Sequence, residues 1–180
     1  MKITSVKNAY IPSFKARFVY DDNLEKFAKK LINADNGDFD ELLIAQKSLE
    51  AEDETTKLRL KEDGDRIVVE IEDPKERQSK FITAGVEKGD RSYKRGMNRA
   101  LYGLTKISDP SSVESRQLFG RYVPDDEAQE RLWRSEIAVE REKSTNPFWQ
   151  MSCEEETPSV KRAAKLAFLA LSCSDLGQKR

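Results

Sequence analysis

The chain has 180 residues, a length that fits one domain of ordinary size. Apolar residues make up 37% of it and charged residues 36%, so there is enough apolar material for a core and disorder throughout is not expected. The net charge is −1, which means that any attraction to nucleic acid or to an anionic membrane must come from a local patch.

The absence of histidine narrows the chemistry that the chain can perform. Histidine is the usual general base near neutral pH, so Ser-His-Asp and Cys-His nucleophile systems are excluded. The two cysteines, Cys153 and Cys173, cannot supply the four ligands of a structural zinc site, and no phosphate-binding or dinucleotide fingerprint is present. We therefore expect a protein that is not an enzyme and holds no cofactor or metal. A carboxylate-based enzyme stays as an alternative, although no spacing of Asp and Glu singles out a working pair.

Neither a secretory signal nor a membrane span is expected from the sequence. The first residues lack a continuous apolar stretch, and the most apolar stretch, Ala163 to Cys173, is too short to cross a bilayer. Two cysteines without a framework pattern favour a reducing compartment. The expected location is the cytoplasm, including that of an infected host cell, or a virion.

Alternation of apolar and polar residues marks strands in the first half of the chain. Alternation over 14–20 predicts one strand, and 56–61 and 66–72 flank an Asp-Gly turn, which is a strong β-hairpin signature. A third strand is expected over 80–86. Two helices, one beginning at Asp22 or Asn23 and one near Asp38, are expected between the first strand and the hairpin.

The pattern becomes helical from residue 89 onward. Helices are expected over 91–107, from about 111 to 122, over 124–143 and over 157–173, with an apolar loop at 148–151. We predict an α+β fold, in which a small antiparallel sheet (the N-terminal strand, the hairpin and a third strand) packs with about six helices and the C-terminal half is helical. A single domain over 1–180 is expected; a subdivision near 108 would separate a sheet-bearing half, 1–107, from a helical half, 108–180.

The expected helix 91–107 carries five basic residues and no acidic one. On a helix these side chains gather on one arc, and Tyr102 falls within it. Basic side chains neutralise phosphates, and an exposed aromatic ring can stack on a base. The candidate nucleic-acid-binding residues are Arg91, Lys94, Arg95, Arg99, Tyr102 and Lys106. The alternative interpretation is an ordinary solvated face, paired with the acidic helix that follows Pro124.

The last expected helix is apolar around much of its circumference, so it needs cover on most sides. Cover by a second chain would make it a self-association surface, and cover by its own chain would make it a central core helix. The segment 148–151 contains Phe, Trp and Met, which are enriched at interface centres, but it could equally fold into the core. The candidate interface residues are Phe148, Trp149, Met151, Ala164, Phe168 and Leu171.

These features favour a protein that acts by presenting surfaces. The leading hypothesis is a non-enzymatic binding and assembly protein that forms homo-oligomers or binds another protein, as viral or phage structural and accessory proteins do. A second hypothesis is an RNA- or DNA-binding protein that uses the helix 91–107. A third is an inhibitor that occludes a host enzyme or complex, which would bind one protein partner and would not self-assemble.

Overall fold

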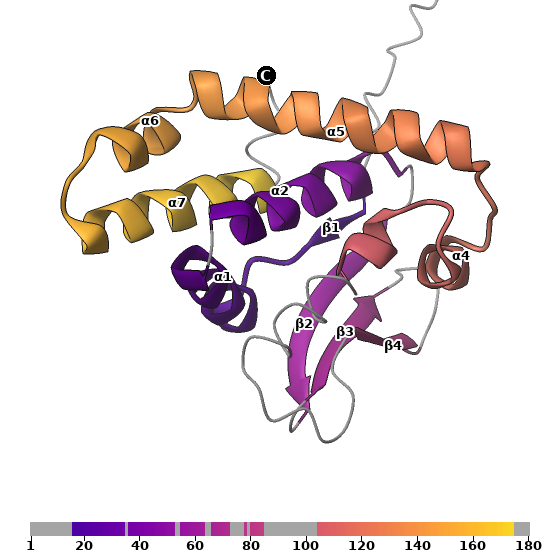
Figure 1. The fold of residues 1–180 in the computed structure, drawn as a ribbon. Helices are drawn as coiled ribbons and strands as arrows, with labels where there is room; N and C mark the ends of the chain where they lie inside the picture. Colours follow the sequence, from indigo (N-terminus) through magenta and orange to yellow (C-terminus); the bar gives the residue numbers. More distant parts are fainter. Residues whose placement is uncertain are drawn as a thin grey trace, which may run out of the picture.

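The computed structural model describes residues 16–34, 36–52, 55–63, 66–72, 78, 80–84 and 104–174. Its elements are β1 (Arg17–Phe18), α1 (Asp22–Ala34), α2 (Asn36–Glu50), β2 (Lys57–Asp63), β3 (Arg66–Glu72), β4 (Lys80–Ala84), α4 (Val113–Phe119), α5 (Asp125–Thr145), α6 (Pro147–Glu154) and α7 (Pro158–Cys173). Residues 104–108 are also helical. The predicted α+β fold is confirmed, with the strands in the first half and a helical C-terminal half (Figure 1).

The strands form one four-stranded sheet in the order β1-β2-β3-β4. β2 and β3 make the expected hairpin, in which Leu58 lies opposite Ile71 and Leu60 opposite Val69; all four are buried. β4 joins antiparallel to β3, as expected for a third strand. β1 pairs in parallel with β2, so the sheet is mixed and the expectation of a purely antiparallel sheet is wrong. The parallel pairing follows from the connection between β1 and β2. α1 and α2 return the chain to the end of the sheet at which β1 begins, so β2 runs in the same direction as β1.

The core lies where α1, α2 and α7 pack together beside the sheet (Figure 1). α1 contributes one apolar face, at helical spacing, with Leu24 and Leu31 fully buried. α2 is buried more widely, and its polar Gln46 is fully buried too, because its side-chain oxygen accepts a hydrogen bond from the Phe18 backbone N–H at 3.0 Å. That bond fixes the short strand β1 to α2.

α7 is covered by its own chain. It contacts α1, α2 and α6, and Phe168 and Leu169 are almost completely buried. Of the two kinds of cover that the sequence allowed, the structure therefore supplies the central core helix. Within the described parts of the chain, no helix combines the length and hydropathy needed to span a membrane.

α6 stands where the sequence predicted an apolar loop, so that prediction is wrong. Asn146 ends α5 and at the same time caps α6, because its side-chain oxygen accepts a hydrogen bond from the Phe148 N–H at 2.9 Å. Pro147 then occupies the first helical position, where its missing N–H costs nothing. Asn-Pro therefore interrupts one helix and begins the next.

Candidate interaction surface

α5 is the outermost long helix of the molecule and crosses one whole side of it (Figure 1). Its first turn carries Asp125, Asp126 and Glu127, and its last turn carries Lys143, a charge order that suits the helix dipole. Only Ala128, Ser135, Val139 and Lys143 of its 21 residues are buried, and they face α2. Most of the helix therefore faces solvent.

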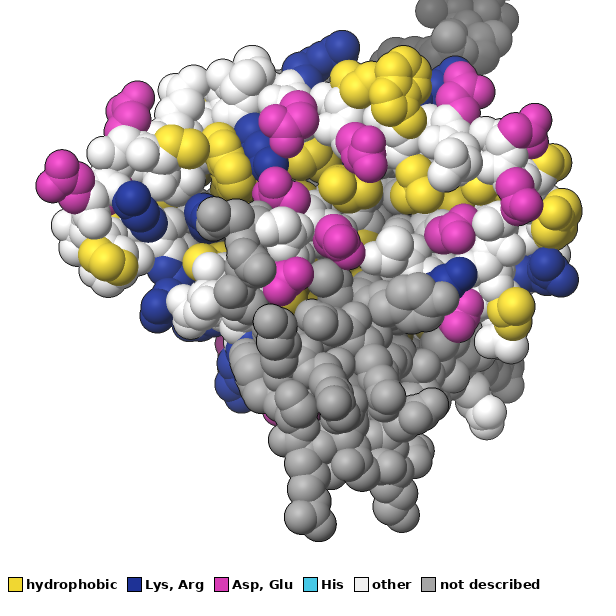
Figure 2. Space-filling model, viewed as in Figure 1, with side chains coloured by type: hydrophobic (Ala, Val, Ile, Leu, Met, Phe, Trp, Pro, Cys, Tyr) yellow, Lys and Arg dark blue, Asp and Glu magenta, His cyan; other side chains and the backbone are white. Residues whose placement is uncertain are grey.

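The solvent face of α5 carries two large apolar side chains. Trp133 is 60% exposed and Ile137 is 40% exposed. They are four residues apart, so they lie next to each other along the helix and form one stripe. We call these two residues the α5 stripe. Figure 2 shows hydrophobic side chains on this outer surface, set among acidic and basic ones. Because tryptophan is enriched at the centres of protein interfaces, the stripe is a candidate contact surface.

A buried carboxylate fixes the first half of α5. Glu52 follows the end of α2 and is 3% exposed, and its two carboxylate oxygens form ion pairs with Arg121 and Arg131. Arg121 precedes α5 and Arg131 lies within it, so both the entry to the helix and its second turn are tied to the end of α2.

A buried lysine fixes the other end of α5. The Lys143 ammonium lies 2.8 Å from Asp40 of α2 and 2.8 Å from Glu140, and 4.6 Å from the centre of the Trp149 ring. Burial lowers the pKa of Lys143, but the hydrogen bonds and charges of Asp40 and Glu140 outweigh it, so that the pKa is raised above its ordinary value. The lysine therefore stays protonated and joins α5 to both α2 and α6.

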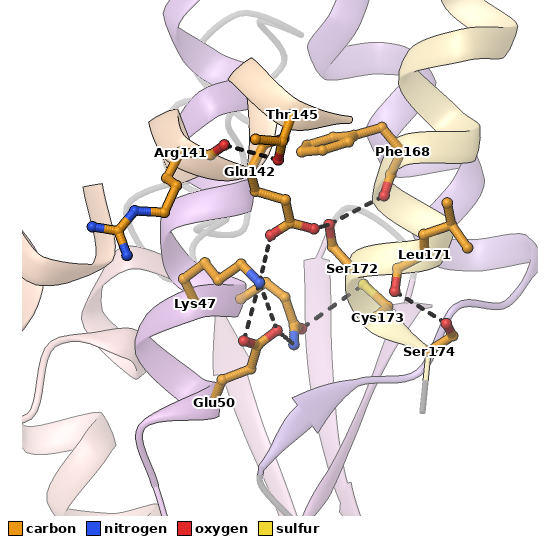
Figure 3. Close-up of polar contacts among 11 residues, drawn as sticks. Lys47, Glu50, Arg141, Glu142, Thr145, Phe168, Leu171, Ser172, Cys173 and Ser174 are labelled. Atoms are coloured by element: carbon orange, nitrogen blue, oxygen red, sulfur yellow. Dashed lines mark hydrogen bonds and ion pairs between the residues drawn. The ribbon is translucent and has the colours of Figure 1, made fainter. Parts of the chain in front are cut away.

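Next to Lys143, a polar network joins three helices (Figure 3). The Lys47 ammonium of α2 lies 3.1 Å from Glu50 and 2.6 Å from Glu142 of α5. The Ser172 hydroxyl of α7 donates to the same Glu142 carboxylate at 3.0 Å, and the neighbouring Cys173 thiol lies 3.8 Å from the Gln46 oxygen. The stripe is thus presented by a helix that is anchored along its inner side.

The groove between α2 and α5 is an open cavity of about 430 Å³. Its charged lining residues include Lys47, Arg131 and Arg134, and these are paired with Glu50, Glu52 and Glu130 respectively. Among the described residues, no group of three or more His, Cys, Asp or Glu is arranged to hold a metal ion. The charges that line this groove mainly attach one helix to the other.

The nucleic-acid candidates from the sequence fall largely outside the described residues. Arg91, Lys94, Arg95, Arg99 and Tyr102 lie there, so their arrangement stays a prediction. Lys106 is described; it is half-buried in the helical segment 104–108, and its backbone carbonyl accepts a hydrogen bond from the Ser112 hydroxyl.

The six interface candidates divide into buried and exposed positions. Ala164 and Phe168 lie in the core, and Leu171 is half-buried. Trp149 is half-buried as well, stacked on Phe39 at 6.5 Å and tilted against Phe168 at 5.4 Å between ring centres. Phe148 and Met151 are exposed on α6, at 36% and 46%, and are the two candidates best placed to meet a partner.

The α5 stripe was not among the candidates drawn from the sequence. A helix was expected at 124–143, but the sequence did not indicate which of its sides faces solvent, so the two apolar residues of the outer side were not recognised as a surface. The available signal was a tryptophan and an isoleucine four residues apart within a segment rich in charged residues.

Comparison with known proteins returned no counterpart: no family model matches the chain, and it matches neither a curated protein nor a solved structure.

Stability should fall in alkaline solution, and Cys173 should account for part of the fall. Burial raises the pKa of its thiol from 9.0 to about 12, and burial also raises the pKa of Tyr20 from 10.0 to about 12. The Cys173 thiol therefore ionises at lower pH in the unfolded chain than in the folded one. Its contribution to the free energy of unfolding is fully present below pH 9.0 and is lost as the pH rises toward about 12. Each such group steepens the decline by up to about 1.4 kcal/mol for each pH unit.

The measurement is urea unfolding over that pH window. Cys173→Ala should give a shallower decline than the wild-type chain, whereas Cys153→Ala, which removes an exposed thiol, should not. Equal slopes for all three proteins would contradict the assignment to Cys173.

Proposed function

We propose that this chain is a non-enzymatic binding and assembly protein that acts by self-association through the α5 stripe. The observation that carries the proposal is the exposure of Trp133 and Ile137 on one side of a helix whose other side is anchored by buried ion pairs. Both cysteines are free thiols, which suits a reducing compartment, so the proposed place of action is the cytoplasm.

The arrangement has the parts of a small protein interface. Tryptophan is among the residues that most often dominate binding energy, and such residues work best when surrounding polar groups exclude water from them. The stripe is flanked by exposed charged side chains, among them Glu130, Arg134, Glu136 and Arg141. Because α5 is already fixed in place, little conformational freedom is lost when a partner binds.

Removing the tryptophan should dissociate the assembly. We expect the purified chain to show a monomer–oligomer equilibrium, and Trp133→Ala to weaken it by about 30-fold or more in Kd, since interface hot spots contribute about 2 kcal/mol or more. Sedimentation analysis over a wide concentration range measures this directly. Val113→Ala is the matched control, because Val113 is 60% exposed like Trp133 but lies on α4.

Two results would contradict the proposal. One is a wild-type chain that stays monomeric at every concentration. The other is a Trp133→Ala chain that assembles as well as the wild type. A monomer that forms a stable complex with a different protein would instead favour the occluding-inhibitor hypothesis.

Nucleic-acid binding is a second candidate function, supported by one basic and one aromatic side chain that lie together at the end of α4. The Arg116 guanidinium lies 5.1 Å above the centre of the Tyr122 ring, which is 61% exposed. The hydroxyl of Ser112, which caps α4, donates to the backbone carbonyl of Lys106, the last of the basic residues in 91–107. A salt-dependent binding assay tests this: unchanged affinity for RNA or DNA in the Arg95→Glu, Arg99→Glu double variant would exclude the segment 91–107 as the binding surface, and no measurable affinity in the wild-type chain would exclude the function.

A further inference from the structure

We propose that two copies of the chain pair through α5 in an antiparallel arrangement with two-fold symmetry. This inference rests on the proposed self-association through the α5 stripe, and it adds the orientation of the partner and the charges that specify it.

Helical spacing places four positions on one line along the solvent face of α5. At about 100° per residue, Asp126 and Ser144 point in the same direction, midway between Trp133 and Ile137. All four are exposed. When the second helix runs in the opposite direction with its Ile137 against Trp133, its Ser144 lies against Asp126. The two stripes then cover each other, and Trp133 of each copy packs against Ile137 of the other.

The charges beside the stripe fit this register. Glu130 and Arg141 lie on the same side of the stripe, and a perpendicular two-fold axis brings like sides together, so Glu130 of each copy meets Arg141 of the other. The Arg141 guanidinium points away from the polar network and forms no ion pair among the described residues (Figure 3). Glu130 pairs with Arg134 within the helix, but both are exposed, at 55% and 72%, so that this pair holds it weakly.

A parallel pairing fits less well. It would set the acidic first turns of the two copies, with Asp125, Asp126 and Glu127, directly beside each other. It would also bring opposite sides of the stripe together, so that Glu130 would lose Arg141 as a partner. The antiparallel arrangement separates the two acidic turns by the length of the helix.

Glu136 tells the two arrangements apart by the sign of its effect. It lies on the side of the stripe opposite Glu130 and Arg141. In the antiparallel pair Glu136 approaches the same residue of the second copy, so Glu136→Gln should tighten the dimer. In a parallel pair Glu136 would face the side that carries Arg134 and Arg141, and the same substitution would weaken the dimer.

Cysteine cross-linking tests the orientation directly. In a Cys153→Ser background, which removes the exposed native thiol, Asp126→Cys and Ser144→Cys are made as separate proteins and mixed. We expect a cross-linked product that contains one of each, and little product from either protein alone. Cross-linking of the Asp126→Cys protein to itself would overturn the antiparallel arrangement.

Charge reversal tests the pairing. Glu130→Arg and Arg141→Glu should each weaken the dimer about tenfold, because symmetry turns two attractive contacts into two repulsive ones. The double variant should restore it, because the ion pairs re-form with opposite polarity. Lys26→Glu reverses an exposed charge on α1 and is the control that should change nothing. A double variant as weak as the single ones would overturn the pairing.

If Trp133→Ala dissociates the dimer but the cross-links join identical positions, self-association through the α5 stripe stands and the antiparallel orientation is wrong. If Trp133→Ala has no effect, the stripe itself is not the contact and both proposals fail.

Discussion

Replacing Phe168 with alanine is expected to lower the free energy of unfolding by about 3–5 kcal/mol. Phe168 is 1% exposed and lies against the Trp149 ring, which in turn stacks on Phe39. Truncation therefore removes a large buried ring and leaves a cavity where α2, α6 and α7 meet. Urea or thermal unfolding of the purified protein measures the loss.

Met151→Ala provides the comparison, because Met151 is 46% exposed on α6 and its truncation should change stability by less than about 0.5 kcal/mol. If Phe168→Ala left the unfolding curve unchanged but altered the oligomeric state, α7 would be an interface helix, and the self-association surface considered from the sequence would replace the one on α5.

The second large effect is expected when Glu52 loses both of its arginines. Arg121→Met and Arg131→Met together should cost about 3–5 kcal/mol, because a buried carboxylate is then left without a compensating charge. Either change alone should cost clearly less, since one ion pair remains. Equilibrium unfolding at neutral pH gives the three values.

Adding Glu52→Gln to the double variant should recover much of the lost stability, because the uncompensated charge is removed. If the double variant merely shows the sum of two small losses, and Glu52→Gln adds a third, then the carboxylate is solvated and does not fix α5 to α2 as described.

The sequence predicted those elements whose cause is local. The hairpin was predictable because alternating residues flank Asp-Gly, and the extents of α1 and α7 followed from the spacing of their apolar residues. The parallel pairing of β1 was not predictable, since strand direction depends on how α1 and α2 return the chain. α6 was missed because Asn146 and Pro147 read as a break, whereas together they cap and begin a helix.

The candidate surface was harder to predict than the fold. The inner side of α5 is made by Ala128, Ser135, Val139 and Lys143, which no apolar periodicity would single out. Lys143 is buried because Asp40, far earlier in the chain, lies beside it. Without knowing which side of α5 faces inward, the sequence could not show that Trp133 and Ile137 face outward.

The way in which α5 is attached should let it unfold locally while the core of the molecule stays folded. Few buried apolar side chains attach α5 to the rest of the molecule, and ion pairs near both of its ends hold it in place. α7, in contrast, is enclosed by apolar contacts. Proteins open in cooperative units whose free energies follow such differences. The amide hydrogens of α5 should therefore exchange with solvent through partial openings that leave α7 protected. Pairing of two α5 helices would slow that exchange further, because a partial opening of α5 would then also have to break the contacts between the two copies.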